Sequence, residues 1–224
     1  EEKDLSVVFA LDVSEQMVFG STNKLKCEFA GEVSLALIHL ILHTHDRVGL
    51  ILFNDKVVEY IPPKKGNKHF YGLVDKIADS TNYGGKSDPS EVLNFIVDDL
   101  GKNINAVFIV SDFLRLNNKH EMLLRLIGSK YESLGIMIRD PLDNTLPSLN
   151  TEIVIEDPNS GQQLLIDPKV AKEEYERIAK EQEILINGMF KGSGIDLIKL
   201  KTDEGFIAPL IEFLQARIKN GRYS

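Results

Sequence analysis

Short runs of apolar residues, rich in β-branched and aromatic side chains, recur along the chain. They are apolar on both faces, which is typical of strands buried inside a parallel sheet. The first run, LSVVFAL, ends directly before Asp12, and a later one, NAVFIVSDF, contains Asp112. We interpret the following runs as buried strands: 5–11, 46–54, 105–113, 134–140 and 194–203.

Longer segments with apolar residues at helical spacing separate these runs. From Leu25 to Ile41 an apolar residue recurs at every fourth position, so one face of a helix would be apolar. The segments that we interpret as helices are 24–45, 69–78, a stretch starting at Pro89, 119–129, 168–189 and 206–218. The alternation of strands and helices predicts an α/β fold with a central, mostly parallel sheet and helices on both faces.

Two segments depart from this alternation. The turn Asn54-Asp55 returns the chain at once into KVVEYI, which predicts an antiparallel edge strand that Pro62-Pro63 ends. Residues 151–167 are interpreted as two short strands around the turn Asn159-Ser160-Gly161. Because no linker or repeat interrupts the pattern, we expect one domain over residues 1–224, with a small β-hairpin insertion at about 151–167.

Composition narrows the classes of function. Hydrophobic residues make up 43% of the chain and charged residues 27%, which are ordinary values for a globular protein. The formal net charge of -8 repels phosphates, and the densest basic spot, Lys64-Lys65, is interpreted as a solvated loop. We therefore expect no nucleic-acid partner. The single cysteine, Cys27, lies in an apolar helical pattern and is interpreted as a buried structural thiol.

Membrane attachment is not expected within this chain. The longest uncharged run, 33–45, is shorter than the roughly 20 apolar residues that span a bilayer, and no signal-peptide pattern is present. The chain begins with Glu1 rather than methionine, so we expect that an upstream region is missing from it. The expected location is cytoplasmic, with membrane anchoring only through those missing residues.

Two aspartates at strand ends mark a candidate site. In open parallel sheets, ligands gather at the carboxyl ends of the strands, where the strand order reverses. Asp12 or Asp112 alone is explained more simply as a turn residue. Together with Ser14, and with Ser87 in the glycine-rich loop GGKSD, they form an all-oxygen set. Such a set suits a hard cation such as Mg²⁺ or Mn²⁺.

These motifs resemble those of a von Willebrand factor A domain. Asp12-x-Ser14, GGKSD and IVSDF carry the resemblance. More narrowly, the chain is similar to the bacterial and archaeal proteins of this class that are associated with MoxR-type AAA+ ATPases. The stretches that carry this closer similarity are DVSEQMVFGSTNKLKCEFA, DRVGLILF, SDFLRL, IRDP and TDEGFIAPLIEFLQARI. The resemblance covers nearly the whole chain and implies a Rossmann-like von Willebrand factor A fold. Members of that family often carry membrane helices upstream of this domain.

The resemblance also implies a metal-ion-dependent adhesion site. It would comprise Asp12, Ser14, position 16, Ser87 and Asp112, with Ser87 standing where the family usually has threonine. Position 16 is Gln16, whose longer side chain places its oxygen differently from a serine hydroxyl. Mg²⁺ demands near-ideal octahedral geometry at roughly 2.0–2.1 Å. We therefore expect a degenerate site, in which Mg²⁺ or Mn²⁺ is bound weakly or not at all.

By the same resemblance, the function would be binding and not catalysis. Ser14 and Ser87 would ligate the ion directly, Asp12 and Asp112 would supply charge directly or through water, and Gly84-Gly85 would let the loop approach. A carboxylate from a partner protein would complete the coordination. The implied partner is a MoxR-type AAA+ ATPase or its client, with this chain as an adaptor or chaperone component.

An alternative from another class is a Mg-dependent nucleotide-binding protein. GGKS resembles the end of a P-loop, and AVFIVSD resembles the strand and aspartate that hold Mg²⁺ in such proteins. However, the P-loop motif requires glycine at position 80, which is Ser80, and a strand before the loop, where FYGLVDKIA is interpreted as a helix. His39 and His43 are spaced as zinc ligands, but no catalytic glutamate follows His39. We expect no catalytic residues.

Overall fold

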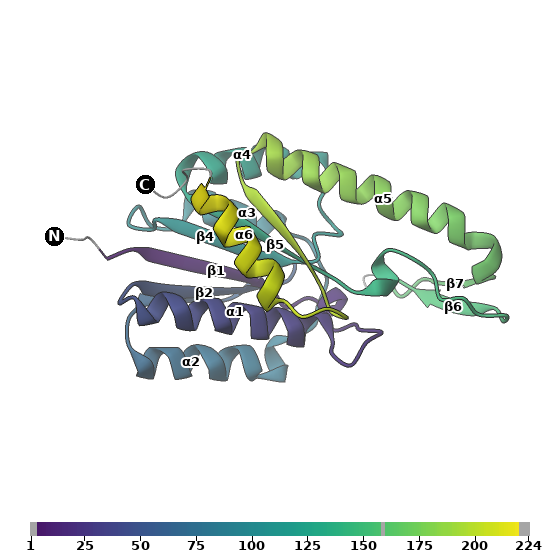
Figure 1. Cartoon of the computed structure of the whole chain (residues 1–224), viewed down its shortest axis with the longest axis horizontal. Coiled ribbons are helices and arrows are strands. Elements are labelled where there is room, and N and C mark those ends of the chain that lie inside the picture. Colours follow the sequence, from purple (N-terminus) through teal and green to yellow (C-terminus); the bar gives the residue numbers. More distant parts are fainter. Residues whose placement is uncertain (1–3, 158–159, 220–224) are drawn as a thin grey trace.

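Six strands form the central sheet of the computed structural model, which describes residues 4–157 and 160–219 (Figure 1). They are β1 Ser6–Asp12, β2 Arg47–Phe53, β3 Val57–Lys64, β4 Ala106–Ser111, β5 Glu132–Arg139 and β8 Asp196–Lys201. Their order in the sheet is β3-β2-β1-β4-β5-β8. Every neighbouring pair is parallel except β2 and β3. The predicted mostly parallel sheet, with one antiparallel strand at an edge, is therefore confirmed.

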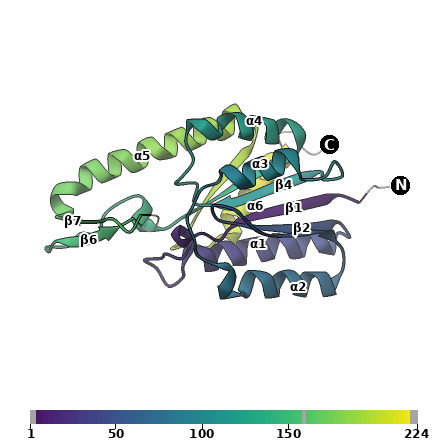
Figure 2. The same cartoon turned by 180° about the vertical axis from the view of Figure 1, so that it is seen from behind.

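Helices cover both faces of the sheet, as predicted. On one face lie α1 Lys26–His43, α2 Asn67–Ala78 and α6 Ile207–Lys219; on the other lie α3 Ser90–Asp98, α4 Glu121–Lys130 and α5 Pro168–Gly192 (Figures 1 and 2). Side chains of β1 alternate between the two cores, with Phe9 in one and Val8 in the other. Each large apolar side chain that folding buries contributes roughly 1.5–3 kcal/mol. Within the described ranges, none of the helices combines the length and apolar character that a bilayer span requires.

The edge strand β3 corrects one expectation. It runs through Pro62-Pro63 to Lys64, so the prediction that the prolines end the strand is wrong. A proline is tolerated at a sheet edge because its missing N–H group needs no partner there. The pairing register shifts between Val48 and Leu50. Gly49 gives the room for this, since a β-carbon on it would lie 2.8 Å from the Ile61 carbonyl oxygen.

A projecting arm extends beyond the sheet. It consists of the first half of α5 and a separate hairpin of β6 Ile153–Glu156 and β7 Gln163–Ile166 (Figures 1 and 2). The two strands match the short strands expected between 151 and 167, while Asn159 of the expected turn lies outside the described residues. Ile186, Met189 and Phe190, in the last turns of α5, pack into the core. The arm is therefore anchored to the core by the last turns of α5.

The strand order places several loops at one edge of the molecule. The chain passes from β1 to β2 on one side and later returns to β4 on the other side of β1. The carboxyl ends of β1, β4, β5 and β8 point to the same edge because these strands are parallel. The segments that follow them meet there, at the reversal of strand order where α/β proteins commonly bind ligands.

Two glycines on packed elements give a test of this arrangement. Gly135→Ala should destabilise the protein by about 1–3 kcal/mol, the usual effect of overpacking. Its β-carbon would collide with the Phe190 ring and lie 2.7 Å from Leu197 Cδ1. Gly188→Ala, on the exposed side of α5 with no atom within 4 Å of the new carbon, should instead stabilise the protein by about 0.5–1 kcal/mol. Urea denaturation should show opposite signs; the same sign for both would contradict the close packing of β5 on α5.

Candidate functional site

Asp12 ends β1 and is 2% exposed. Its Oδ1 accepts the Ser14 N–H at 2.9 Å, and its Oδ2 accepts the Ser111 hydroxyl at 2.6 Å. Ser14 Oγ is fully buried and makes no hydrogen bond of ordinary geometry to any described residue, although it lies near enough to the Asp12 carboxylate to favour its ionised form. Buried hydroxyls usually have a partner. This hydroxyl therefore has hydrogen-bonding capacity that the described residues leave unused.

The glycine-rich loop approaches the end of β1 through backbone hydrogen bonds. Gly84 and Gly85 have φ values of 115° and 80°, in the region that favours glycine. The Gly84 N–H donates to the Val13 carbonyl at 2.8 Å, and the Gly85 carbonyl accepts the Glu15 N–H at 2.9 Å. These contacts bring the buried Ser87 against the same small cavity as Asp12. The glycine-rich loop therefore lies against the end of β1, while its approach to an ion stays a prediction.

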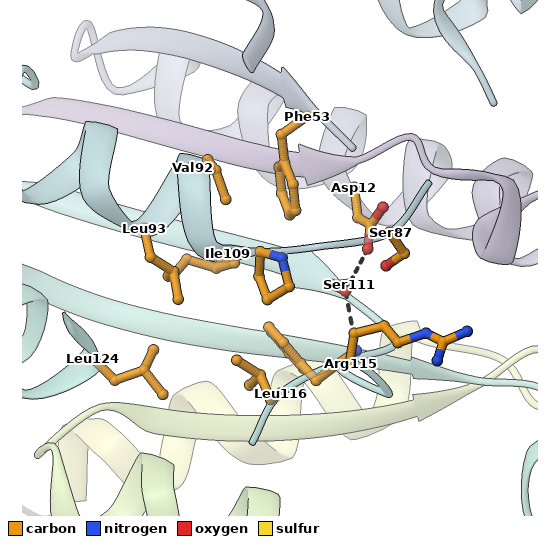
Figure 3. Close-up of a pocket in the computed structure, with 12 residues that line it drawn as sticks. Asp12, Phe53, Ser87, Val92, Leu93, Ile109, Ser111, Arg115, Leu116 and Leu124 are labelled. Carbon is orange, nitrogen blue, oxygen red and sulfur yellow. Dashed lines mark hydrogen bonds between the residues drawn. The ribbon is translucent and has the colours of Figure 1, made fainter. Parts of the chain in front are cut away.

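This cavity has a polar corner and apolar walls. Its volume is about 10 Å³, which is about the room that one water molecule needs. Figure 3 shows the oxygens of Asp12, Ser87 and Ser111 gathered at one end, with Phe53 and Ile109 among the apolar side chains behind them. The corner is large enough for a water molecule and too small for an organic substrate.

Asp112 directly follows β4, in a strained segment. Its Oδ1 accepts the Leu114 N–H at 2.9 Å. The next residue, Phe113, has a φ of 56°, which is uncommon for a bulky side chain. The conformation is held by a hydrogen bond from the Phe113 N–H to Ser111 Oγ at 3.0 Å and by the Phe190 ring, whose centroid lies 4.9 Å away. Strained residues of this kind cluster at functional sites, and they persist only where the surrounding structure enforces their conformation.

Lys26, the first residue of α1, brings its ammonium group into the site. Its Nζ donates to Asp112 Oδ2 at 2.8 Å and lies 3.2 Å and 3.3 Å from the two carboxylate oxygens of Asp143. The Lys26 side chain is 2% exposed. Burial lowers the pKa of Lys26, but attraction to Asp112 and to Asp143 raises it overall above its ordinary value. The lysine is therefore charged at neutral pH.

The IRDP segment fixes the loops around Lys26. Asp140 accepts hydrogen bonds from the Ser21 N–H at 2.8 Å, from the Ser21 hydroxyl at 2.5 Å and from the Thr202 hydroxyl at 3.2 Å. Burial raises the pKa of Asp140, but these hydrogen bonds lower it overall. The Asp140 N–H in turn donates to Asp143 Oδ2 at 2.9 Å. The loop before α1, the end of β5 and the end of β8 are thus joined.

Burial in the site raises the pKa of the Asp12 carboxyl. The pKa rises from 3.8 to about 6, mainly because the group is buried and also because the charge of Asp112 is close, while hydrogen bonds from Ser111 and Ser14 oppose the rise. A carboxylate with a raised pKa is stabilised when a proton or a cation neutralises it. The site therefore favours an additional positive charge next to Asp12.

Gln16 lies in a 3-10 turn, Glu15–Met17, directly after Ser14. Its amide oxygen accepts a hydrogen bond from Arg115 Nε at 3.3 Å, and Arg115 Nη2 pairs with Asp157 at 2.6 Å. The oxygen would have to leave this guanidinium in order to ligate a cation. The degenerate character of the metal site stays a prediction, now with a physical reason at Gln16.

A groove of about 420 Å³ lies between this site and the arm. Lys26 and Asp143 line it on the side of the site, and Val154 of β6 lines it on the side of the arm. Between them are apolar side chains that include Phe19 and Leu114. The groove thus joins a buried charged cluster to an apolar surface.

Residues 1–184 match the family described as "Protein of unknown function DUF58". This chain belongs to the DUF58 family. It is 26% identical over 220 residues to "Uncharacterized protein Rv1480" of Mycobacterium tuberculosis, covering 96% of this chain and 68% of that protein. "Uncharacterized protein MAV169" of Mycobacterium avium is 27% identical over 111 residues, which are 49% of this chain and 64% of that protein.

Solved structures share the fold of this DUF58 chain. The conserved hypothetical protein BatB from Bacteroides thetaiotaomicron has a TM-score of 0.62 at 15% identity, covering 98% of this chain and 100% of that one. An aerotolerance-related membrane protein from Bacteroides fragilis has 0.54 at 13% identity, covering 88% and 92%. The SpRpn10 VWA domain has 0.51 at 10% identity, covering 93% and 94%. The von Willebrand factor A-like fold expected from the sequence is confirmed.

The DUF58 chain brings together the four predicted site residues with others that the sequence analysis missed. Asp12 and Ser87 line the same small cavity, Ser14 is hydrogen-bonded to Asp12, and Asp112 lies near enough to Asp12 to raise its pKa. Lys26 was missed, although it belongs to the buried stripe that continues through Ala30, Val33 and Leu37, a spacing that places a lysine on an apolar face. Further residues that were missed are Ser111, Arg115 and Asp143.

Replacing Asp12 by asparagine tests the raised pKa of Asp12 in the metal-free DUF58 protein. Because the folded state binds this proton more tightly than the unfolded state does, Asp12 makes the protein less stable as pH rises from about 4 to about 6. This rise in the pKa of Asp12 corresponds to roughly 3 kcal/mol of unfolding free energy. Asp12→Asn should therefore match the parent near pH 4 and exceed it in unfolding free energy at pH 7 to 8. Denaturant titrations with EDTA at each pH measure this; a constant difference between the two proteins would contradict the raised pKa.

Proposed function

We propose that this chain is a protein–protein interaction module without enzymatic activity, and that it binds its partner with the carboxyl edge of its sheet. The single observation that carries the proposal is the groove of about 420 Å³ that connects the charged cluster at Lys26 to the arm. Concave sites that combine apolar walls with a few converging polar groups are the usual binding places on proteins. A partner would insert an apolar anchor here and place a polar group at the inner end.

The arm supports a protein as the ligand of this groove. Four large apolar side chains on the hairpin and at the start of α5 are more than half exposed: Val154 59%, Leu164 63%, Leu165 60% and Val170 79%. Val154 and Leu165 are directly opposite each other in the hairpin and so share one of its faces. Exposed apolar groups on one face mark interaction surfaces. On the family resemblance, the proposed partner is a MoxR-type AAA+ ATPase or its client, with this chain acting as an adaptor. The net charge of -8 disfavours a nucleic-acid partner.

We propose Mg²⁺ or Mn²⁺ as the ion of the site, bound weakly. Asp12, Ser14 and Ser87 fit such an ion in their chemistry, and the buried Ser14 hydroxyl without a hydrogen-bond partner supports this. Asp112 fits less well, because the positively charged ammonium of Lys26 already pairs with its Oδ2, whereas the donors to Asp12 are neutral. When bound, the ion would supply a positive centre for a partner carboxylate. Backbone hydrogen bonds would hold the loop after β1 and the glycine-rich loop together around the ion.

The alternative of a nucleotide-binding P-loop has less support. The GGKS loop follows α2 and a 3-10 turn, Ser80–Asn82, whereas a P-loop connects a strand to a helix. The helix expected before the loop is therefore present. Lys86 is exposed on this loop. We keep binding of a protein partner as the proposed function.

We propose a cytoplasmic location, with any membrane attachment through segments outside this chain. The similar structure from Bacteroides fragilis is described as a membrane protein. An adaptor of this kind would then present the carboxyl edge of its sheet to a partner near a membrane.

The groove proposal predicts that Val154→Asp weakens binding of the partner. A charge in the groove would meet apolar side chains of the ligand, and loss of one central apolar anchor lowers affinity by about tenfold or more. The matched control is Leu40→Asp, which changes a residue of similar exposure, 57% against 59%, on α1. Titration of a purified MoxR-type ATPase from the same organism measures both. Unchanged affinity of Val154→Asp would exclude the groove, and no binding by the parent would exclude this partner.

A second prediction concerns Gln16. Gln16→Ser restores a small hydroxyl that Arg115 does not hold, so this variant should bind Mg²⁺ or Mn²⁺ more tightly than the parent does. Adding Asp112→Ala should abolish the gain. Metal should also raise the melting temperature of Gln16→Ser more than that of the parent, by mass action. Calorimetric titration measures the affinity. Strong binding by the parent with no gain in the variant would show that the site is not degenerate at Gln16.

A further inference from the structure

The side chain of Lys26 is almost fully buried at the inner end of the groove. It lies 2.8 Å from Asp112 Oδ2 and 3.2 Å from Asp143 Oδ1, and the side chains of these three residues are 2%, 1% and 8% exposed. The face of the Phe19 ring lies 5.7 Å from Nζ, within the range of a cation–π contact. A charge that is buried to this degree is stable only when opposite charges replace its lost hydration. Lys26 is therefore fully paired inside the site.

The fold holds Lys26 in this position. The residue is the first of α1, where a positive charge is unfavourable because the helix amino terminus is itself positive. The Lys26 N–H donates to the Phe19 carbonyl at 2.8 Å, and Glu28 caps the helix through the Leu25 N–H. The side chain continues the buried stripe of α1. Its location at Asp112 thus results from the packing of the whole helix.

The contacts of Asp112 leave little for a metal ion. Its Oδ1 accepts the Leu114 N–H, and its Oδ2 accepts the ammonium of Lys26. A divalent ion that ligates Asp112 directly would have to displace Lys26, and one that binds beside it would be repelled by it at short range. Among the described residues, Asp12 accepts hydrogen bonds only from neutral groups, the Ser14 N–H and the Ser111 hydroxyl, whereas Asp112 is already paired with a cation.

We propose that Lys26 is the resident cation of this site: it takes the place at Asp112 that the family resemblance assigns to a divalent metal, and a metal binds only in competition with it. This inference rests on the proposed function only in that the latter places a cation at the same edge. The ammonium of Lys26 would then hold the loops at the carboxyl edge of the sheet in place, and supply a positive charge there, without a tightly bound ion. The partner-binding edge would accordingly work in the presence of a chelator.

The test measures Mn²⁺ and Mg²⁺ binding by calorimetric titration, with no partner protein present. Lys26→Met should bind Mn²⁺ about tenfold or more tightly than the parent, because a repelling charge close to the ion is removed. Adding Asp112→Ala should abolish this gain. The control Lys24→Met alters a lysine two positions earlier, 45% exposed and paired with Glu32, and it should bind as the parent does.

Melting temperature gives a second measurement. Lys26→Met leaves Asp112 and Asp143 buried without their counter-ion, so it should melt lower in EDTA and recover when Mn²⁺ is added, whereas the parent and Lys24→Met should respond little. Should Lys26→Met fail to fold, the double variant Lys26→Met/Asp143→Asn removes one charge of each sign and carries the same expectation of tighter Mn²⁺ binding.

Two results would overturn the inference. One is equal Mn²⁺ affinity of the parent and the Lys26 variants, which would leave Lys26 as a structural ion pair only. The other is tight Mn²⁺ binding by the parent, because an ion would then coexist with the ammonium group. Both results are separate from the partner experiment, since a groove that binds no ATPase leaves the competition between Lys26 and metal unchanged.

Discussion

The buried ammonium of Lys26 is the interaction on which the arrangement of the carboxyl edge depends. It joins the start of α1 to Asp112 after β4 and to Asp143 after β5, residues that are 86 and 117 positions away in the sequence. Breaking a buried pair by removing one partner typically costs about 3–5 kcal/mol, because the remaining charge is left uncompensated. The three loops therefore form one unit. Asp140, through Ser21 and Thr202, ties the end of β8 to the same unit.

The apolar cores of the fold offset the free energy that this concentration of buried charge costs. Asp12 and Asp112 lie buried at the ends of strands whose side chains fill two apolar cores, one on each face of the sheet, and Asp143 lies half-buried in the turn after β5. The burial of the Asp12 charge and the left-handed backbone of Phe113 both oppose folding locally. The stabilisation comes from the cores, while the strain lies at the edge. That division is common in proteins whose function resides in loops on a rigid scaffold.

The arm gives this edge a second, apolar component. The last turns of α5 pack into the core, while its first half and the hairpin of β6 and β7 stand clear of the sheet (Figure 1). The groove therefore has a charged end set by Lys26 and an apolar side set by Val154. Interfaces draw most of their affinity from a few apolar anchors and their orientation from polar groups. A surface that offers both, with one rigid and one projecting wall, is suited to a protein ligand.

The sequence by itself determined the α/β class, the parallel sheet with one antiparallel edge strand, and Asp12 and Asp112 as strand-end residues. These features follow from periodicity, which is local. The tertiary structure decided the path of β3 through Pro62-Pro63, because tolerance of proline depends on which strand lies at the edge. It also decided the place of Lys26. Spacing puts this lysine on the apolar face of α1, but only packing brings two carboxylates from distant strands within hydrogen-bond distance. A charge buried in this way is stable only with those partners, and their positions belong to the assembled sheet.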